Sequence, residues 1–579
     1  MRIFALVICL IICFLKVTPN SYHVKTTGTS AGDGSIDNPW NLQTALNHPS
    51  KVKPGDTIWI HEGIYTGVFT SELKGSQSAP IIVRPLHDNE VILDGNTGLN
   101  VGSVLVINGR YTWFFGLTIL NTNGNRINLT EDPLFDDKTG VNIFGANNKL
   151  INCIIRDNGG SGVGFWKTAI NSEIYGCIIY HNGYIGEKRG HGHALYPQND
   201  AGTKLITDNI IFNSFGYGIH VYTSGGAIKG FNIDGNILFN CGLPSAFPLE
   251  NHILVGGSQQ ADRVKISNNY FYNRPLYSAK AILRLGYIST NKSASCFDNY
   301  MVNGSFCVET PWDSVTFKNN TVIAANSDKQ LIEFTKSFSD IKNPLFDYNI
   351  YHKGKLNSLT FENWQSTTNQ DFNSVYHSQS PSSTFYFLKE NQYEKGRANL
   401  VIYNWEMSDY VEINASDFLS LYDEYELWDV QYMSQGPIKT GIYNGSIKVP
   451  MNLTSIDLPY GNIPNTDIFS HTAPSFGVFI IQKTNSSNNI IQKKNNASLI
   501  DIYPNPAINQ IFIDFFMPYS CTTDIGIYDL SGRLIQSETV NVNIGKNNYS
   551  LNLDKLEKGV YMVVVSTEKD KLTGKIFKK

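Results

Sequence analysis

The chain has 579 residues, which is too long for one ordinary domain and predicts three or four folded units. It contains 48 glycines and 12% aromatic residues but only 17% charged residues, a mixture that favours strands and turns over helices. The formal net charge of -4 is close to neutral for this size and gives no indication of a nucleic-acid partner.

The N-terminus is typical of a secretory signal peptide, which we expect to cover residues 1–21. Arg2 precedes an apolar run from Ile3 to Leu15, and small or polar residues follow, so cleavage is expected between Thr18 and Tyr22. The run is short for a membrane span and no second one follows. The mature chain is therefore predicted to be soluble, with no transmembrane segment.

A short phrase recurs along the next part of the chain: a polar or small residue, an apolar triplet and then Asn. Its copies run from "GLTILN" at Gly116 to "YNIYHK" at Tyr348, at intervals of 21 to 36 residues. A unit of this length cannot bury its own apolar face, so the repeat indicates a stacked array. Two or three brief strands per unit, separated by Gly and Asn turns, predict the coils of a parallel β-helix over residues 22–355. Asn side chains beside the strands are expected to form ladders along the stack.

Cysteine spacing argues against a dense disulfide framework and a zinc site, because no CxxC pair occurs. Cys153 and Cys177 occupy the same repeat position, one coil apart. We favour a reduced, buried pair here, since free cysteine behaves as a small apolar residue, and a disulfide is the alternative.

The segment before the repeats contains "SYHVKTTGTSAGDGSIDNPWNLQTAL" and "VKPGDTIWIHEGIYTG". In this part the chain resembles the secreted right-handed parallel β-helix proteins of the pectate-lyase-like superfamily. The resemblance covers roughly residues 22–355 and implies that "NLQTAL" is a short helix that caps the stack. It is specific for the fold and weak for the activity.

After residue 355 the phrase stops, and residues 356–483 are predicted to form a polar connection and an antiparallel β-sandwich. Longer alternating runs such as "NLVIYNW" and "FGVFIIQK" supply its strands. We expect this sandwich to contact substrate or to brace the C-terminal end of the stack. Residues 484–498 have the composition of a flexible linker.

Residues 499–579 contain "IYPNPA", "IYDLSGRLI" and "LEKGVYMVVVS" in that order. This resembles the C-terminal sorting domain of the type IX secretion system, a small β-sandwich. The resemblance implies a Bacteroidota-type host, the type IX machinery as a partner, and export through the periplasm and outer membrane to the cell surface or the medium. The whole chain is thus predicted to be all-β, with a right-handed parallel β-helix followed by two β-sandwiches.

Strand alternation points to a candidate site on one outer face of the β-helix. In "GIHVY", Ile219 and Val221 face the core, which turns His220 and Tyr222 outward. When the strands are aligned on their leading glycines, Gly164 and Ala194 become the neighbours of His220. Trp166, Tyr196 and Tyr222 then form an aromatic column that suits a carbohydrate groove. By its alignment with Ile219, His193 is either a core histidine or a member of this site.

Two chemistries compete for this groove. A lyase needs a cation that neutralises a uronate carboxylate, for which Arg284, Lys280 and Arg189 are candidates, and a base such as His220 or Tyr222. A glycoside hydrolase needs two carboxylates, for which the candidates are Glu250, Glu309 and Asp200, without a fixed pair. The candidate catalytic residues are His220, Tyr222, Arg284, Glu309 and His191. The candidate substrate-binding residues are Trp166, Tyr196, Gln198, His193, Arg189 and Glu250.

The sequence therefore predicts a secreted, carbohydrate-active protein with a polysaccharide as its partner. An enzyme is favoured, a polysaccharide lyase or glycoside hydrolase acting on an extracellular polymer for which uronate is one candidate constituent. The alternative is a non-catalytic glycan-binding or structural β-helix protein. We expect a monomer with no cofactor and no metal; calcium fits the chemistry, but no acidic ladder supports it.

Overall fold

The computed structural model describes residues 19–87, 90–98, 102–245, 250–275, 281–463, 466–484, 500–517, 521–529, 532–542, 545–566 and 571–579. Most of the predicted signal peptide, nearly all of the predicted linker and Lys280 lie outside these residues. The described helices are too short and too polar to span a membrane.

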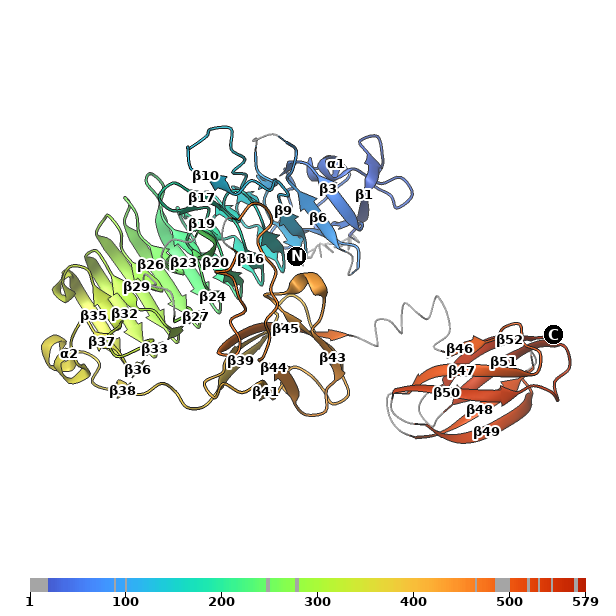
Figure 1. Ribbon diagram of the computed structural model, residues 1–579. Coiled ribbons are helices and arrows are strands. Elements are labelled where there is room, and N and C mark those ends of the chain that lie inside the picture. Colours follow the sequence, from blue (N-terminus) through green and yellow to red (C-terminus); the bar gives the residue numbers. More distant parts are fainter. Residues whose placement is uncertain are drawn as a thin grey trace, which may run out of the picture.

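Three parallel sheets wind around one apolar core and form a parallel β-helix, with successive coils seen side by side in Figure 1. Sheet A consists of β1 (Ser21–Thr29), β2 (Thr57–Ile60), β5 (Ile81–Pro85), β8 (Thr112–Phe115), β12 (Lys149–Ile151), β15 (Glu173–Tyr175), β20 (Lys204–Thr207), β23 (Ile228–Asp234), β26 (Ala261–Ser267), β29 (Asn291–Phe297), β32 (Trp312–Lys318) and β35 (Ile341–Asp347). Sheet B consists of β3 (Gly63–Thr66), β6 (Val91–Asp94), β9 (Thr118–Leu120), β13 (Ile154–Arg156), β16 (Ile178–Tyr180), β21 (Ile210–Phe212), β24 (Ile237–Phe239), β27 (Tyr270–Tyr272), β30 (Tyr300–Val302), β33 (Thr321–Ile323), β36 (Ile350–His352) and β38 (Val375–His377). Sheet C consists of β4 (Phe69–Ser71), β7 (Leu105–Ile107), β11 (Val141–Ile143), β14 (Val163–Phe165), β19 (Leu195–Pro197), β22 (Ile219–Val221), β25 (Ile253–Val255), β28 (Leu283–Leu285), β31 (Phe306–Val308), β34 (Gln330–Phe334) and β37 (Lys355–Leu356).

The repeated phrase marks the corner between sheets A and B. Its first residue takes a left-handed backbone conformation, as at Asp208 and Asn268, which Asn, Asp and Gly adopt most readily. The next residue is a buried Asn whose amide donates to the Asn of the following coil, as from Asn209 to Asn236 at 2.9 Å. The predicted ladder runs through Asn209, Asn236, Asn269, Asn299, Asn320 and Asn349. Cys177 occupies the preceding place, where its backbone N–H donates to Asn209.

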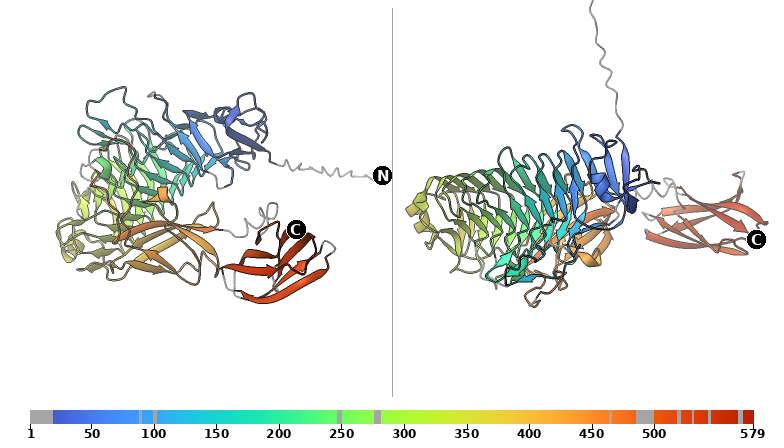
Figure 2. Two further views of the ribbon diagram at one scale, coloured as in Figure 1. Left: turned by 45° about the vertical axis from the view of Figure 1, so that its right-hand side comes forward. Right: turned by 90° about the horizontal axis from the view of Figure 1, so that it is seen from above.

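The two ends of the stack are covered by helices, which Figure 2 shows at opposite ends of the coils. At the N-terminal end, α1 (Leu42–Leu46) is the helix expected at "NLQTAL", with Asn41 as its N-cap. At the other end, α2 (Phe361–Thr368) buries Trp364 against Phe334. Parallel pairing continues to β38, so the coils extend past residue 355, and α2 forms part of the segment predicted as a connection. Cys153 and Cys177 are buried and free.

The antiparallel sandwich contains a five-stranded sheet and a two-stranded sheet. These are β39 (Phe385–Glu390), β40 (Arg397–Tyr403), β45 (Phe476–Thr484), β42 (Glu424–Asp429) and β43 (Lys439–Ile442), with β41 (Tyr410–Ile413) and β44 (Ile447–Pro450). One face of the larger sheet packs on the smaller sheet, and the other packs on the outer face of sheet B. Phe476 stacks on Tyr272 at this contact, with ring centroids 4.4 Å apart. The sandwich therefore covers a flank of the β-helix rather than its C-terminal end (Figure 1).

The C-terminal unit has its own apolar core between two antiparallel sheets. The sheets are formed by β46 (Ile500–Tyr503), β47 (Gln510–Met517) and β50 (Gly545–Asn552), and by β49 (Leu534–Val542), β48 (Cys521–Tyr528), β51 (Gly559–Ser566) and β52 (Lys571–Lys578). This is the second small β-sandwich that the sequence predicts.

Candidate functional site

The outer face of sheet C carries His220, with Ile219 and Val221 buried on either side of it in β22. Leu195 pairs with Ile219, so Tyr196 lies beside His220. The expected alignment, which put Ala194 there, is therefore wrong by two residues; Gly164 pairs with Tyr196 instead. His220, Tyr196 and Trp166 still face outward as predicted, because a shift of two residues preserves the alternation, whereas Ala194, predicted to face outward, is buried in the core.

Five aromatic rings in contact form what we call the aromatic shelf: Phe144, Trp166, Tyr196, Tyr222 and Tyr287. Phe144 stacks on Trp166 at 5.9 Å between ring centroids, and Trp166 meets Tyr196 at 5.8 Å. Tyr196 then contacts Tyr222 at 6.3 Å, and Tyr222 contacts Tyr287 at 5.8 Å. The predicted aromatics thus touch one another, in diagonal contacts rather than in a single strand position. Half-exposed rings in a row suit the apolar faces of sugars.

Two histidines and a tyrosine gather beside the shelf. Nε2 of His193 lies 3.1 Å from Nδ1 of His220, and Nδ1 of His193 accepts a hydrogen bond from the backbone N–H of Tyr217 at 3.1 Å. The ring of Tyr217 lies 4.4 Å from that of His220, and Tyr222 stacks on His220 at 4.9 Å. His193 is thus buried, but it belongs to this cluster rather than to the core of the β-helix.

Burial determines the charge state of this cluster. Desolvation, followed by the nearby charges of Arg189 and Arg284, lowers the pKa of His220 to about 3. Desolvation and then His220 lower the pKa of His193 well below its ordinary value. Desolvation raises the pKa of Tyr217 to about 12, with a smaller contribution from Glu250. At neutral pH the two imidazoles and the phenol are therefore uncharged, and the arginines supply the positive potential.

Arg284 on β28 stands in the same column as His220, with Leu254 of β25 between them. Two strand spacings separate their backbones by about 10 Å. Its guanidinium forms an ion pair with Glu309 and lies 5.3 Å from the centroid of the Tyr287 ring. Arg284 and Glu309 are therefore brought to the end of the shelf as one pair.

His191 lies on a small separate sheet, formed by β10 (Ile127–Asn128), β17 (Tyr184–Gly186) and β18 (Gly190–His191), and Arg189 lies in the turn between β17 and β18. His191 stacks on Tyr184 at 4.8 Å in a cleft of about 550 Å³ that Arg189 also lines. His191 belongs to this cleft, and the charge of Arg189 acts on both His191 and His220. Arg189 therefore connects the cleft to the histidine cluster.

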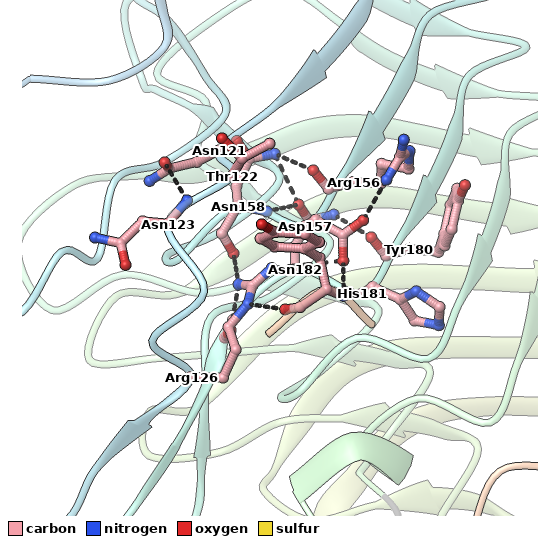
Figure 3. A network of polar contacts seen from close by, with 12 residues as sticks. Asn121, Thr122, Asn123, Arg126, Arg156, Asp157, Asn158, Tyr180, His181 and Asn182 are labelled. Carbon is pink, nitrogen blue, oxygen red and sulfur yellow. Dashed lines mark hydrogen bonds and ion pairs between the residues drawn. The ribbon is translucent and has the colours of Figure 1, made fainter. Parts of the chain in front are cut away.

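A buried arginine holds the small sheet in place. Arg126 donates from Nη1 to the carbonyls of Asn158 and Gly183, at 2.6 and 2.9 Å, and pairs with Asp157 (Figure 3). Its carbonyl accepts from the backbone of Ile185 on β17 at 2.8 Å. Residues 451–463 and 466–475 of the sandwich, which we call the strap, reach the same arginine, since its Nε donates to the carbonyl of Tyr460.

Lys204 binds the backbone at the ends of the strands that carry Trp166 and Tyr196. It is fully buried, and its ammonium donates to the carbonyls of Phe165, Trp166 and Gln198 at 3.1, 2.7 and 2.6 Å. Gln198 is itself buried at the end of β19. These bonds fix the ends of β14 and β19, and with them the position of the Trp166 ring.

Several residues of this site were not found from the sequence. Tyr217, Phe144 and Tyr287 lie just before or after the observed strands of sheet C, and Asn142 accepts a hydrogen bond from the Trp166 indole nitrogen at 2.8 Å. Of the hydrolase candidates, Glu309 is paired with Arg284, Glu250 is buried and Asp200 is exposed. Within the described residues, no group of three or more histidine, cysteine or acidic side chains is arranged to hold a metal ion.

Two parts of the chain match models of known protein families. Residues 22–245 match the family model described as "Pel9A-like, right handed beta helix region". The β-helix part of the chain is therefore similar to right-handed β-helix proteins of the pectate-lyase-like kind. Residues 501–579 match the secretion system C-terminal sorting domain, so this β-helix is a type IX secretion cargo, sorted to the cell surface or the medium.

Individual relatives are distant. Pectate lyase L of Thermoclostridium stercorarium is 25% identical over 364 residues, which are 54% of this chain and 26% of the relative. This chain thus matches about a quarter of that protein's length. Among solved structures, an alginate lyase from Paenibacillus sp. str. FPU-7 is 17% identical, covering 62% of this chain and 98% of that one, with a TM-score of 0.34. Pectate lyase Pel9A is 14% identical over 62% of this chain and 80% of its own, with a TM-score of 0.32.

Proposed function

We propose that this protein is a polysaccharide lyase that cleaves a uronate-containing polymer by β-elimination on the outer face of sheet C. The observation that carries the proposal is the convergence of two arginine charges on an uncharged His220 and Tyr217 beside the aromatic shelf. A simple glycan-binding surface requires the aromatics alone. The family model and the pectate lyase relative support the same class of reaction.

The shelf supplies the binding surface. Its rings run across neighbouring strands of sheet C, so a sugar chain lying across the coils would meet one aromatic face after another. Arg284 stands at the end of the shelf, with its guanidinium against Tyr287. A uronate unit stacked near Tyr222 therefore lies between Arg284 and the histidine cluster.

The reaction needs three roles. Arg284 and Arg189 neutralise the carboxylate, which makes the neighbouring C5 proton more acidic. A base removes that proton, the C5–H electron pair forms the C4–C5 double bond, and the C4–O bond breaks. The leaving oxygen takes a proton from an acid, for which Tyr217 is suited because its raised pKa keeps the phenol protonated. The predicted bases are His220 and Tyr222.

Glu309 has a supporting role in this scheme. Its ion pair with Arg284 leaves it poorly placed as one of the two free carboxylates that a glycoside hydrolase needs. It orients the guanidinium instead. No step of the proposal uses a metal ion.

The test incubates the full chain with a panel of uronate and neutral polysaccharides. Ultraviolet absorbance reports unsaturated ends, and a reducing-sugar assay reports all new ends. We expect both signals with a uronate polymer, and their loss in His220→Ala with the fold intact. The control is His377→Ala, which changes an exposed histidine on β38. Reducing ends without absorbance would indicate a hydrolase, and binding without either signal would indicate a non-catalytic protein.

A further inference from the structure

The hydrogen bonds of the histidine cluster run in one direction. The chain starts at the backbone N–H of Tyr217, which can only donate and is bound to Nδ1 of His193. Nδ1 of His193 is therefore an unprotonated acceptor. A neutral imidazole has one N–H, so the proton of His193 is on Nε2.

The proton on His193 determines in the same way which nitrogen of His220 is protonated. Nε2 of His193 lies 3.1 Å from Nδ1 of His220, and because the former carries the proton, the latter must accept. The proton of neutral His220 is then on its Nε2. That nitrogen has no hydrogen-bond partner among the residues that the structure describes.

We infer that His193 is a positioning residue that fixes His220 in its Nε2-protonated form, so that His220 offers an N–H to the bound saccharide instead of acting as the base. The contact between His220 and the saccharide rests on the proposed lyase function. The position of the proton on His220 is independent of that function.

The neighbours of His220 agree with a fixed, uncharged ring. Tyr217 and Tyr222 lie 4.4 and 4.9 Å from it, and Tyr196 meets it edge-on at 5.5 Å. The charged groups acting on it, Arg189 and Arg284, are both cations and oppose its protonation. Neither of these two groups is a carboxylate, so neither favours a second proton on the ring.

The consequence for the reaction is a division of roles. The Nε2–H of His220 donates to an oxygen of the uronate carboxylate and, with Arg284, stabilises the negative charge that develops there as C5 loses its proton. No bond to His220 forms or breaks. Of the two predicted bases, Tyr222 is then the one that takes the C5 proton, reacting as its phenolate and becoming a neutral phenol.

The first test is the proton position in the full chain labelled with ¹⁵N-histidine. Long-range proton–nitrogen NMR distinguishes the two ring nitrogens, and His220→Gln identifies the His220 signals among the 12 histidines. We expect Nε2 protonated and Nδ1 unprotonated at neutral pH. A proton on Nδ1, or a mixture of both forms, would overturn the inference whether or not the protein is a lyase.

The second test is the dependence on His193. His193→Phe keeps a ring but removes both nitrogens, so His220 should become a mixture of forms, and kcat should fall about 10-fold, more than KM changes. His193→Gln keeps an acceptor and a donor and should restore the Nε2-protonated form. An unchanged His220 in His193→Phe would show that His193 does not fix it. If that variant does not fold, the ¹⁵N–¹⁵N coupling across the His193–His220 hydrogen bond in the unaltered chain decides, and its absence contradicts the inference.

Discussion

Asn142 accepts a hydrogen bond from the indole nitrogen of Trp166 at 2.8 Å, in a space that exists because residue 164 is glycine. A Cβ at Gly164 would lie 2.1 Å from Oδ1 of Asn142 and 2.9 Å from Nε1 of Trp166. The glycine therefore keeps the two side chains together and the indole in line with the rest of the aromatic shelf.

Gly164→Ala should accordingly weaken substrate binding. The methyl group must push Asn142 or Trp166 aside, at a cost of about 1–3 kcal/mol in the free energy of unfolding. Isothermal titration with an inactive variant as the background should show a several-fold weaker oligosaccharide affinity. Gly225→Ala is the matched control, because a Cβ there has no neighbour within 4 Å. Equal affinities in the two variants would remove Trp166 from the binding surface.

Tyr217→Phe tests whether the Tyr217 hydroxyl is the proton donor to the leaving oxygen. The ring and its contact with His220 are kept, while the hydroxyl is lost, so kcat should fall about 100-fold with little change in KM. Tyr287→Phe, which alters an exposed ring at the end of the shelf, should retain most of the activity. Steady-state kinetics on the same polymer compares them. A large rise in KM with constant kcat in Tyr217→Phe would assign that hydroxyl to binding.

The buried histidines predict a loss of stability in acid. The pKa of His220 is lowered to about 3 and those of His181 and His252 to about 4, so the unfolded chain binds protons that the folded chain does not. The stabilisation that comes from keeping these histidines uncharged is complete above the ordinary histidine pKa of about 6.5. It is lost from the free energy of unfolding as the pH falls from there toward 4 and 3. The urea midpoint should therefore decrease between pH 7 and pH 5.

A variant can separate the contribution of His220 to this loss of stability from the contributions of other titrating groups. His220→Gln removes one such group, so its urea midpoint should change less with pH than that of the unaltered chain. Identical pH profiles for the two proteins would contradict the low pKa of His220.

Arg126 connects the sandwich to the cleft, so its replacement should affect both stability and recognition. Arg126→Met removes the bonds to Asn158, Gly183 and Tyr460, at a cost of about 3 kcal/mol. Asp157 then keeps its ion pair with Arg156 and the hydrogen bond that it accepts from the backbone N–H of Tyr460. Because the small sheet carries Arg189, KM for an anionic polymer should also rise. Arg263→Met, which breaks an exposed pair with Asp262, should change stability by less than about 1 kcal/mol. Denaturation and kinetics that match this control would show that the strap does not support the site.

Much of the fold could be predicted because the coil corner demands particular residues. The left-handed corner residue recurs in every phrase and the laddered Asn in the phrases from Asn209 to Asn349, and alternation correctly turned His220, Trp166 and Tyr196 outward. The register could not be predicted in the same way, because coils of unequal length and the small sheet at β17 and β18 separate the strands. The adjacency of Tyr196 and His220 therefore came only from the structure.

The contact between the sandwich and the β-helix had a signal that was overlooked. The triplets "IIY", "IIF" and "ILF" of sheet B are apolar at every position, which is typical of strands buried on both faces. The sequence around Tyr217 contains no comparable signal, since a tyrosine between two glycines before a strand is compatible with many structural roles. Its role follows only from its distance to His220.

The most direct test of the proposed lyase is the mass of the products from a defined uronate oligosaccharide. Elimination transfers no water, so the two fragments should sum to the mass of the substrate, with the unsaturated fragment lighter by one water than its hydrolytic equivalent. Two fragments that together exceed the substrate by one water would contradict the account.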